Sequence, residues 1–145
     1  MQVLHKEYET IDFSSLKKKI NSWSDEVGFQ KTGVSDINLS MAEERLTNWL
    51  KLKFHGSMKY MEKHGSKRYR PQELVPGTLR IISVRMDYLP QEQEAAINQL
   101  NDNRNAYVSR YALGRDYHKV LRKKLKLLAK RIEENIGEFG YRIFV

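Results

Sequence analysis

The chain has 145 residues, of which 40% are hydrophobic and 30% are charged, a composition typical of a globular domain with its own core. It contains no cysteine, which excludes disulfides, thiolate metal sites, cysteine nucleophiles and any iron–sulfur cluster held by this chain alone. Lysine and arginine outnumber aspartate and glutamate by 26 to 18, and the net charge of +8 favours a polyanionic partner such as nucleic acid.

The hydropathy along the chain indicates where in the cell the protein is expected to be. No apolar run approaches the ~20 residues that span a bilayer. The segment 1–7 has no apolar core of the kind that marks a secretory signal. These two features predict a cytoplasmic protein that does not associate with membranes.

The pattern of apolar residues predicts a first helix over residues 12–27, with lysines on its exposed side. Its buried stripe is expected to consist of Leu16, Ile20, Trp23 and Val27. Asp12, Ser14 or Ser15 is expected to cap the start of this helix, and Gly28 its end.

The next part of the chain is expected to hold a strand, a capped helix and a helical turn. The strand covers residues 30–37, where β-favouring residues gather. Ser40 and Glu43 have the spacing of a capping box, and the helix that they begin is expected to end near residues 55–56. A short helical turn follows and ends near residues 64–65.

The second half of the chain begins with the strongest strand, residues 79–89, whose dense apolar side chains predict a buried strand. Residues 91–105 are polar and predict a surface excursion that starts as a helix. Asp116 is expected to cap the longest helix, and Gly137 and Gly140 are expected to bracket its end. Its buried stripe is expected to be Leu121, Leu125, Leu128 and Ile132. Its exposed side is expected to carry Lys119, Arg122, Lys123, Lys126 and Lys130.

The last five residues, 141–145, have a strand pattern that reaches the end of the sequence. Since domains rarely finish on a hydrophobic strand, we expect residues 1–145 to be one domain that is incomplete at its C-terminus. With residues 107–110 as a further candidate strand, the elements predict an α/β (α+β) fold, a small mixed sheet flanked by helices. An unpaired last strand also favours self-association or docking onto a partner chain.

Two stretches carry side chains suited to ligand binding. Residues 65–71 form a basic loop before the strongest strand, where guanidinium groups can bind phosphate or amide oxygens. A solvated basic loop is the alternative interpretation. Residues 107–118 place tyrosines, arginines and a serine just before a helix N-terminus, which suits a planar or anionic ligand. The alternative there is a capped helix with packing tyrosines.

Three phrases of this sequence resemble the epoxyqueuosine reductase family. They are GSMKYM at residues 56–61, KRYRP followed by LVPG within residues 67–77, and above all SRYALGRDYH at residues 109–118. The closing FGYR at residues 139–142 also fits. The likeness extends in order and spacing from about Gly28 onward.

The resemblance implies a role in queuosine biosynthesis. Enzymes of this family are oxidoreductases that reduce epoxyqueuosine to queuosine in tRNA, and they use cobalamin and two [4Fe–4S] clusters. By this resemblance, the chain is the N-terminal cobalamin-binding part of such an enzyme. The residues that it implies for cofactor binding are Arg68, Ser109, Arg110, Tyr111, Arg115, Tyr117 and His118. Such donors suit the amide-rich edge of a corrin ring.

No residue of this chain is expected to ligate a metal. A familiar cobalamin signature, Asp-x-His-x-x-Gly, begins like Asp116-Tyr117-His118, but Leu121 stands where the glycine belongs. We therefore expect His118 to be a helix-start residue or polar contact rather than a cobalt ligand. The other histidines lack metal-ligand spacing, and no Walker A loop, Rossmann fingerprint or nucleophile elbow is present.

The chain also departs from the family. The family's sequence continues past the position of Val145 into a proton-donating aspartate and then into the cluster-binding cysteines, and this chain has neither. We therefore expect no catalytic residue, no reductase activity alone, and weak or absent tRNA binding. The alternatives are a stand-alone basic RNA-binding module, which uses residues 67–70 and the last helix, and a protein-interaction module that docks through residues 141–145.

Overall fold

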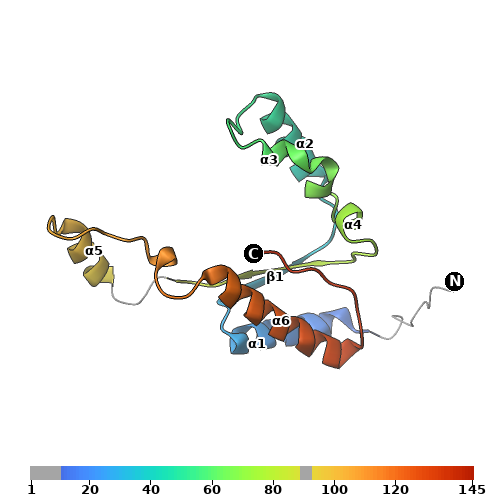
Figure 1. Ribbon diagram of the computed structural model, residues 1–145. Coiled ribbons are helices and arrows are strands. Elements are labelled where there is room, and N and C mark those ends of the chain that lie inside the picture. Colours follow the sequence, from blue (N-terminus) through green and yellow to red (C-terminus); the bar gives the residue numbers. More distant parts are fainter. Residues whose placement is uncertain (1–10, 89–92) are drawn as a thin grey trace. The chain divides into compact units, whose positions relative to one another are not determined.

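The computed structural model describes residues 11–88 and 93–145. Figure 1 follows these residues through a mixed α/β fold, so the expected fold class is confirmed. In chain order, with η for short 3-10 helices, the described elements are α1 (Phe13–Val27), β1 (Lys31–Ser35), α2 (Ser40–Lys51), α3 (Tyr60–Lys63), η2 (Gly65–Arg68), α4 (Pro71–Leu74), β2 (Ile81–Arg85), α5 (Gln93–Asn101), η3 (Arg110–Ala112) and α6 (Tyr117–Ile136). What the sequence predicts for residues 1–7 and 89–92 lies outside the described residues.

The chain forms two compact units. The first unit takes the described residues of 1–32, 84–138 and 143–145, and it contains α1, α5, η3 and α6. The second unit takes residues 33–83 and 139–142, and it contains α2, α3, η2 and α4. Strands β1 and β2 each run from one unit into the other. No described helix combines the length and the apolar character needed to cross a membrane.

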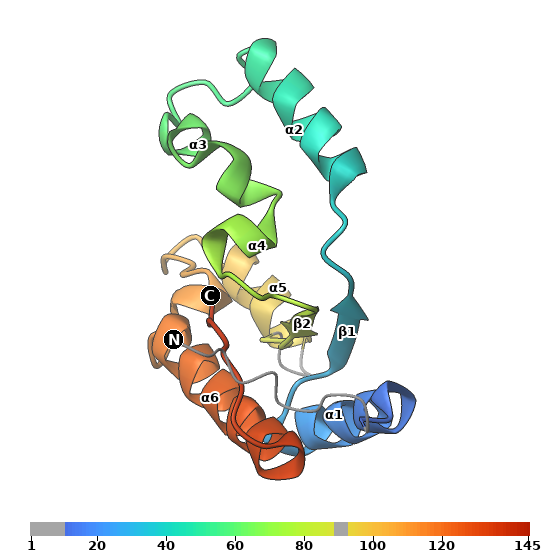
Figure 2. The same ribbon diagram turned by 90° about the vertical axis from the view of Figure 1, so that its right-hand side faces the viewer.

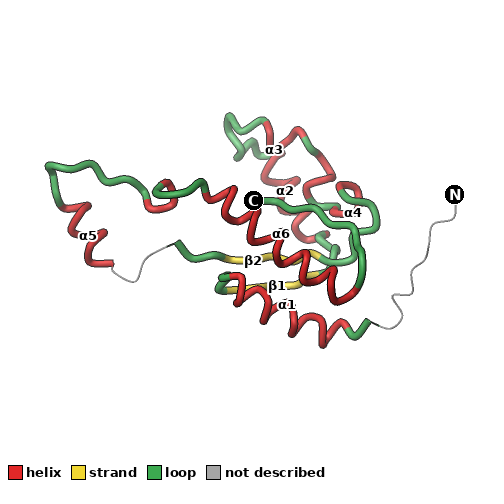
Figure 3. Tube along the Cα trace, turned by 60° about the horizontal axis from the view of Figure 1, so that its bottom comes forward, coloured by secondary structure: helices red, strands yellow, loops and turns green. Residues whose placement is uncertain are grey.

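Strands β1 and β2 pair with each other in a two-stranded sheet, which Figure 3 shows in yellow. Gln30, just before β1, donates its backbone N–H to the carbonyl of Arg85 at the end of β2, at 2.9 Å. The start of β1 therefore lies beside the end of β2, and the pair is antiparallel. Both strands are confirmed, but the expectation of a buried strand is wrong because β2 is only half-buried, with a single neighbouring strand.

The two other expected strands are not found. Residues 107–109 are irregular and lead into η3, and residues 141–145 are irregular as well. A strand needs a regular ladder of hydrogen bonds to a neighbouring strand. Among the described residues, the only ladder joins β1 to β2. The segment 141–145 therefore offers no preformed strand for self-association.

Helix α1 begins and ends where its sequence predicts. The Asp12 carboxylate accepts the N–H groups of Ser14 and Ser15, at 2.9 and 3.1 Å. Gly28 ends the helix in the left-handed region, with φ of 91°. Because a side chain is strained at this φ, glycine is the residue that ends such a helix most readily.

Helices α1 and α6 pack side by side and form the core of the first unit (Figure 1). The buried apolar residues of this unit are Leu16, Ile20, Phe29, Leu128, Ala129 and Ile132. The expected stripe on α6 is thus confirmed for its last two members, while Leu121 and Leu125 are half-buried.

Polar contacts fix the direction of the α1–α6 pair. Near the end of α1, the Lys124 ammonium donates to the Val27 carbonyl at 2.5 Å. At the other end of the pair, the Lys19 ammonium donates to the Asn135 side chain at 3.4 Å. The end of α1 therefore contacts the first half of α6, and the first half of α1 contacts the end of α6. The two helices run antiparallel.

Helix α2 of the second unit lacks the expected capping box. Leu39 is the N-cap, and no side chain caps the helix from that position. Instead the Asn38 side chain accepts the N–H of Ser40 at 3.2 Å. The expectation was wrong because the Glu43 carboxylate is engaged by Arg70, at 2.8 Å, instead of turning back toward the helix start.

Figure 2 follows the chain from α2 through a loop into α3. His55 lies in this loop and is buried, with 5% of its surface exposed. Its Nε2 atom lies 2.8 Å from the Glu62 carboxylate, and its ring lies 5.7 Å from the Trp49 ring. The expected helical turn before Gly65 is confirmed as α3, and His55 ties it to the end of α2.

Candidate functional site

The stretch 109–118 connects η3 to the start of α6 and lies in the first unit. Ser109 precedes η3, and its carbonyl accepts the N–H of Ala112 at 2.9 Å, while its hydroxyl makes no capping hydrogen bond. Gly114 turns the chain with φ of 78°. This left-handed turn brings the backbone round into α6 and leaves the Ser109 hydroxyl exposed.

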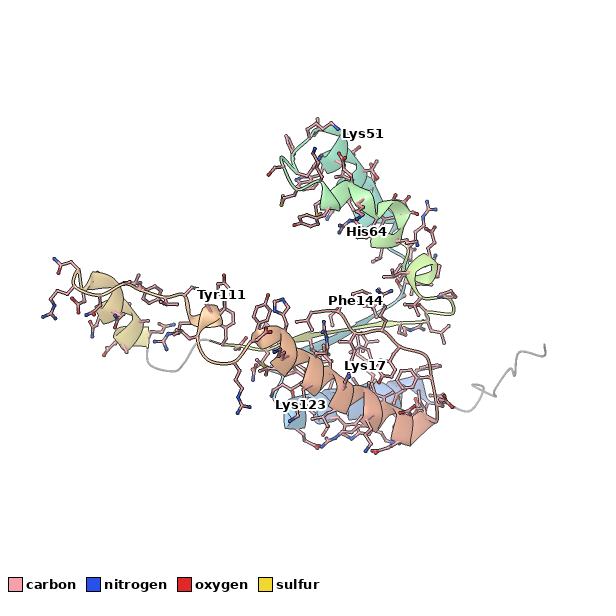
Figure 4. The ribbon with its side chains drawn as sticks, in the orientation of Figure 1. Lys17, Lys51, His64, Tyr111, Lys123 and Phe144 are labelled. Carbon is pink, nitrogen blue, oxygen red and sulfur yellow. The ribbon has the colours of Figure 1, made fainter. Side chains whose placement is uncertain are left out.

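Aromatic rings gather where the chain enters α6. The Tyr111 and Tyr117 rings meet edge to face, with centroids 6.2 Å apart, and the Tyr117 and His118 rings stack at 3.9 Å. Figure 4 labels Tyr111 on the loop that leads into α6. Tyr111 is 56% exposed and Tyr117 39% exposed. The packed rings thus offer an open surface on which a planar ligand can lie.

Asp116 is the N-cap of α6, as its position in the sequence predicts. One carboxylate oxygen accepts the N–H of His118 at 2.9 Å and lies 3.0 Å from Nδ1 of the same residue. The pKa of Asp116 is held below its ordinary value, first by the hydrogen bond from the His118 ring and then by the His118 N–H. The expectation that His118 is a helix-start residue is confirmed.

Removing the ring of His118 should raise the pKa of Asp116 toward its ordinary value of 3.8. Because the folded pKa lies below the unfolded one, the stabilising contribution of Asp116 is present above the unfolded pKa and is lost as pH falls through the folded pKa. His118→Ala should therefore make stability less pH-dependent below pH 3.8. Carboxyl NMR titration measures this, with Asp102, whose pKa Arg104 lowers, as the internal control. An unchanged Asp116 pKa would contradict the assignment.

Arg110 and Arg115 flank the aromatic rings in sequence. Arg110 is half-buried and Arg115 is exposed. Neither guanidinium forms an ion pair with an acidic side chain in the part of the chain that the structure describes. Their donors are therefore available to carboxylate, phosphate or amide oxygens of a ligand.

Arg68 lies at the end of η2 in the second unit. Its Nη2 atom donates to the Tyr60 carbonyl at 2.5 Å, and its guanidinium carbon lies 5.9 Å from the centre of the Tyr60 ring. Its Nε atom is buried and has no hydrogen-bond partner among the described residues. Arg68 is thus held in place by part of its guanidinium group while one donor remains unused.

The rest of the basic loop is largely neutralised. Arg70 forms ion pairs with Glu43 at 2.8 Å and Glu73 at 3.2 Å, and these partners raise its pKa. The hydroxyl of Ser66 donates to Glu73 at 2.5 Å and is the main cause of the lowered pKa of Glu73. Of the two arginines in the basic loop, the structure therefore leaves Arg68 rather than Arg70 for a ligand.

The structure brings together most, though not all, of the site residues that the sequence predicts. Six of them lie in the stretch 109–118 of the first unit, and Arg68 belongs to the second unit. Sequence reasoning missed Tyr60, which orients Arg68, and Glu43, which binds Arg70. The phrase GSMKYM at residues 56–61 was the only sequence signal for Tyr60. Among the described residues, no three His, Cys, Asp or Glu side chains form a metal-binding group.

A family model described as "Epoxyqueuosine reductase QueG, DUF1730" matches residues 68–145, more than half of the chain. The chain belongs to the epoxyqueuosine reductase family. All seven candidate residues lie inside the matched region. The resemblance read from the sequence phrases is therefore confirmed.

Curated relatives support this assignment. The epoxyqueuosine reductase of Pseudomonas aeruginosa is 54% identical to this chain over 92% of the chain and 37% of the relative. Those of Vibrio cholerae and Escherichia coli are 50% and 48% identical, over 93% and 94% of the chain and 36% of each relative. The chain thus spans little more than a third of the length of these epoxyqueuosine reductases. No solved structure gives a significant match to it.

Proposed function

We propose that this chain is the N-terminal, cobalamin-binding part of a tRNA epoxyqueuosine reductase. The observation that carries the proposal is the stretch 109–118, where exposed donors and stacked aromatic rings surround the start of α6 inside the matched region. Residues 1–145 then form an N-terminal domain of the longer family protein. We place it in the cytoplasm, where a tRNA-modifying enzyme meets its substrate.

The donor set fits cobalamin. The corrin edge carries amide groups that accept hydrogen bonds, and the chain offers the unused Nε of Arg68, the free hydroxyl of Ser109 and the guanidinium of Arg115. Each of these groups has a donor that the described structure does not satisfy. We propose that each of these three residues binds amide groups of the corrin edge, and that Arg110, Tyr111, Tyr117 and His118 take part in cofactor binding beside Ser109 and Arg115 in the first unit. When bound, the cofactor supplies the electron-transfer chemistry of the reductase.

Reductase activity is not expected from this chain alone. [4Fe–4S] clusters are held by cysteine thiolates, and the chain has none. The electrons that reduce an epoxide must then come from a cluster-bearing segment or a partner chain. We propose that this chain binds and orients the cofactor, while tRNA reduction requires the remaining two thirds of the family's length.

Titration of the full chain with cob(II)alamin, followed by its absorption spectrum, tests the proposal. We expect saturable binding that Arg68→Ala and Ser109→Ala each weaken about tenfold, because a lost hydrogen bond to a ligand is worth ~1.4 kcal/mol. Lys67→Ala is the matched control, since this neighbouring cation is exposed and its loss should leave affinity unchanged. Circular dichroism verifies that each variant is folded. Absence of saturable binding, or equal weakening by Lys67→Ala, would refute the proposed cofactor site.

A further inference from the structure

One face of helix α6 carries only positively charged side chains and is called here the α6 basic face. It consists of Lys119, Arg122, Lys123, Lys126 and Lys130. At 3.6 residues per turn these side chains fall within an arc of about 100° and extend along about 16 Å of the helix. All five are exposed, and Figure 4 labels Lys123 among them.

The other side of α6 determines which way this face points. Leu128 and Ile132 lie about opposite to the basic arc and are buried where α6 packs on α1. Lys124 and Arg131 also point to that side, where they bind the Val27 carbonyl and the Glu26 carboxylate. The helix therefore cannot rotate, and the basic face is held toward solvent.

The cations of the face are almost free of internal partners. Among the described residues, Lys130 is the only member of the face that forms an ion pair, with Glu134 at 3.6 Å. Lys119, Arg122, Lys123 and Lys126 form no ion pair within the described part of the chain. In contrast, the other cations of α6, Lys124 and Arg131, are both engaged with α1. Four unpaired cations on one rigid face repel each other, and a polyanion relieves that repulsion.

We infer that the α6 basic face docks the phosphate backbone of RNA, which for the proposed function is the tRNA substrate. Regularly spaced cations on a rigid helix suit a chain of phosphates, and release of counterions from the RNA drives such binding. An anionic membrane is disfavoured, because a helix that lies in a membrane inserts its apolar face, and the apolar face of α6 is buried against α1. The inference rests on the proposed function for the identity of the RNA.

The test is binding of the full chain to an unmodified tRNA transcript, measured by fluorescence anisotropy across a range of salt concentrations. The variant Arg122→Gln/Lys123→Gln/Lys126→Gln removes three charges from the face. The matched control, Arg45→Gln/Lys51→Gln/Lys59→Gln, removes three exposed cations from the second unit, none of them in an ion pair among the described residues. Vesicles of phosphatidylserine and phosphatidylcholine provide the membrane arm.

We expect the face variant to bind tRNA roughly 500-fold more weakly at 100 mM salt, because each of three lost phosphate contacts contributes about 0.9 to the slope of log K against log salt. The magnitude of that slope should fall by two to three, whereas the control variant should keep the wild-type slope. Equal losses in both variants would overturn the inference, since net charge alone would then explain binding. So would binding to vesicles but not to tRNA.

The cobalamin titration separates this inference from the proposed function. The face variant should bind cob(II)alamin like the wild type, because none of its three substituted residues belongs to the proposed cofactor site. If the wild type fails to bind cobalamin while the tRNA results hold, the docking face stands and the cofactor assignment falls. If cobalamin binds and the face variant keeps wild-type tRNA affinity, the docking face is wrong.

Discussion

Replacing Phe29 by alanine is expected to lower the free energy of unfolding of the first unit by about 3–5 kcal/mol. Phe29 follows α1 directly and is the largest fully buried side chain among the described residues, with 2% of its surface exposed. The Lys124 ammonium lies 5.9 Å from the centre of its ring. Alanine would leave a cavity at the junction of α1, β1 and α6, and the loss includes this cavity as well as the buried apolar area.

Urea denaturation followed by tryptophan fluorescence measures this effect. The chain has two tryptophans, Trp23 in the first unit and Trp49 in the second. In a Trp49→Phe background, Trp23 reports on the first unit alone. Phe54→Ala is the control, because Phe54 is 64% exposed and its removal should change stability by less than about 0.5 kcal/mol. Equal effects of the two substitutions would contradict the assignment of the core.

Gly28→Ala is expected to destabilise the first unit by about 2–4 kcal/mol, for two separable reasons. An alanine at φ of 91° is strained by about 1–2 kcal/mol. Its Cβ atom would also lie 2.6 Å from the Lys124 ammonium and displace it from the Val27 carbonyl. A hydrogen bond from a charged group contributes about 1.5–3 kcal/mol, and partial loss of it adds to the strain.

A double-mutant cycle with Lys124→Met separates the two contributions. Methionine removes the ammonium and keeps most of the apolar stem, so Gly28→Ala in this background should cost only the backbone strain of about 1–2 kcal/mol. The free energies of unfolding of the four proteins, from urea denaturation, give the coupling directly. Zero coupling would show that Lys124 and position 28 act independently, against the contact that the structure shows.

Phe29→Ala and Gly28→Ala should also affect function, because the α1–α6 core supports the start of α6. Tyr117 and His118, the first two residues of α6, belong to the candidate cofactor site. The α6 basic face begins one residue later, at Lys119. Loss of the core should therefore weaken cobalamin and RNA binding together, whereas the site and face variants affect one of them each.

The sequence by itself determined the two long helices α1 and α6 and their ends, but not the end of α2, which stops at Lys51 rather than near residues 55–56. Asp12, Gly28, Asp116 and Gly137 all cap helices where their positions predict, because capping depends on residues within one turn of the cap. The family also followed from short phrases, since they keep their order and spacing. The capping box at Ser40 failed although its pattern was local, because a residue 27 positions away engages Glu43.

Only the tertiary structure decided which polar groups remain available. In sequence, Arg68 and Arg70 are equivalent members of a basic loop, yet Glu43 and Glu73 neutralise Arg70 while Arg68 keeps an unused donor. Lys123 and Lys124 are adjacent, yet one points to solvent and the other binds the end of α1. Strand pairing was undetermined for the same reason. Ion pairs and the hydrogen bonds between strands can join residues that are distant in sequence. The local periodicity of apolar residues does not indicate which distant residue will be the partner.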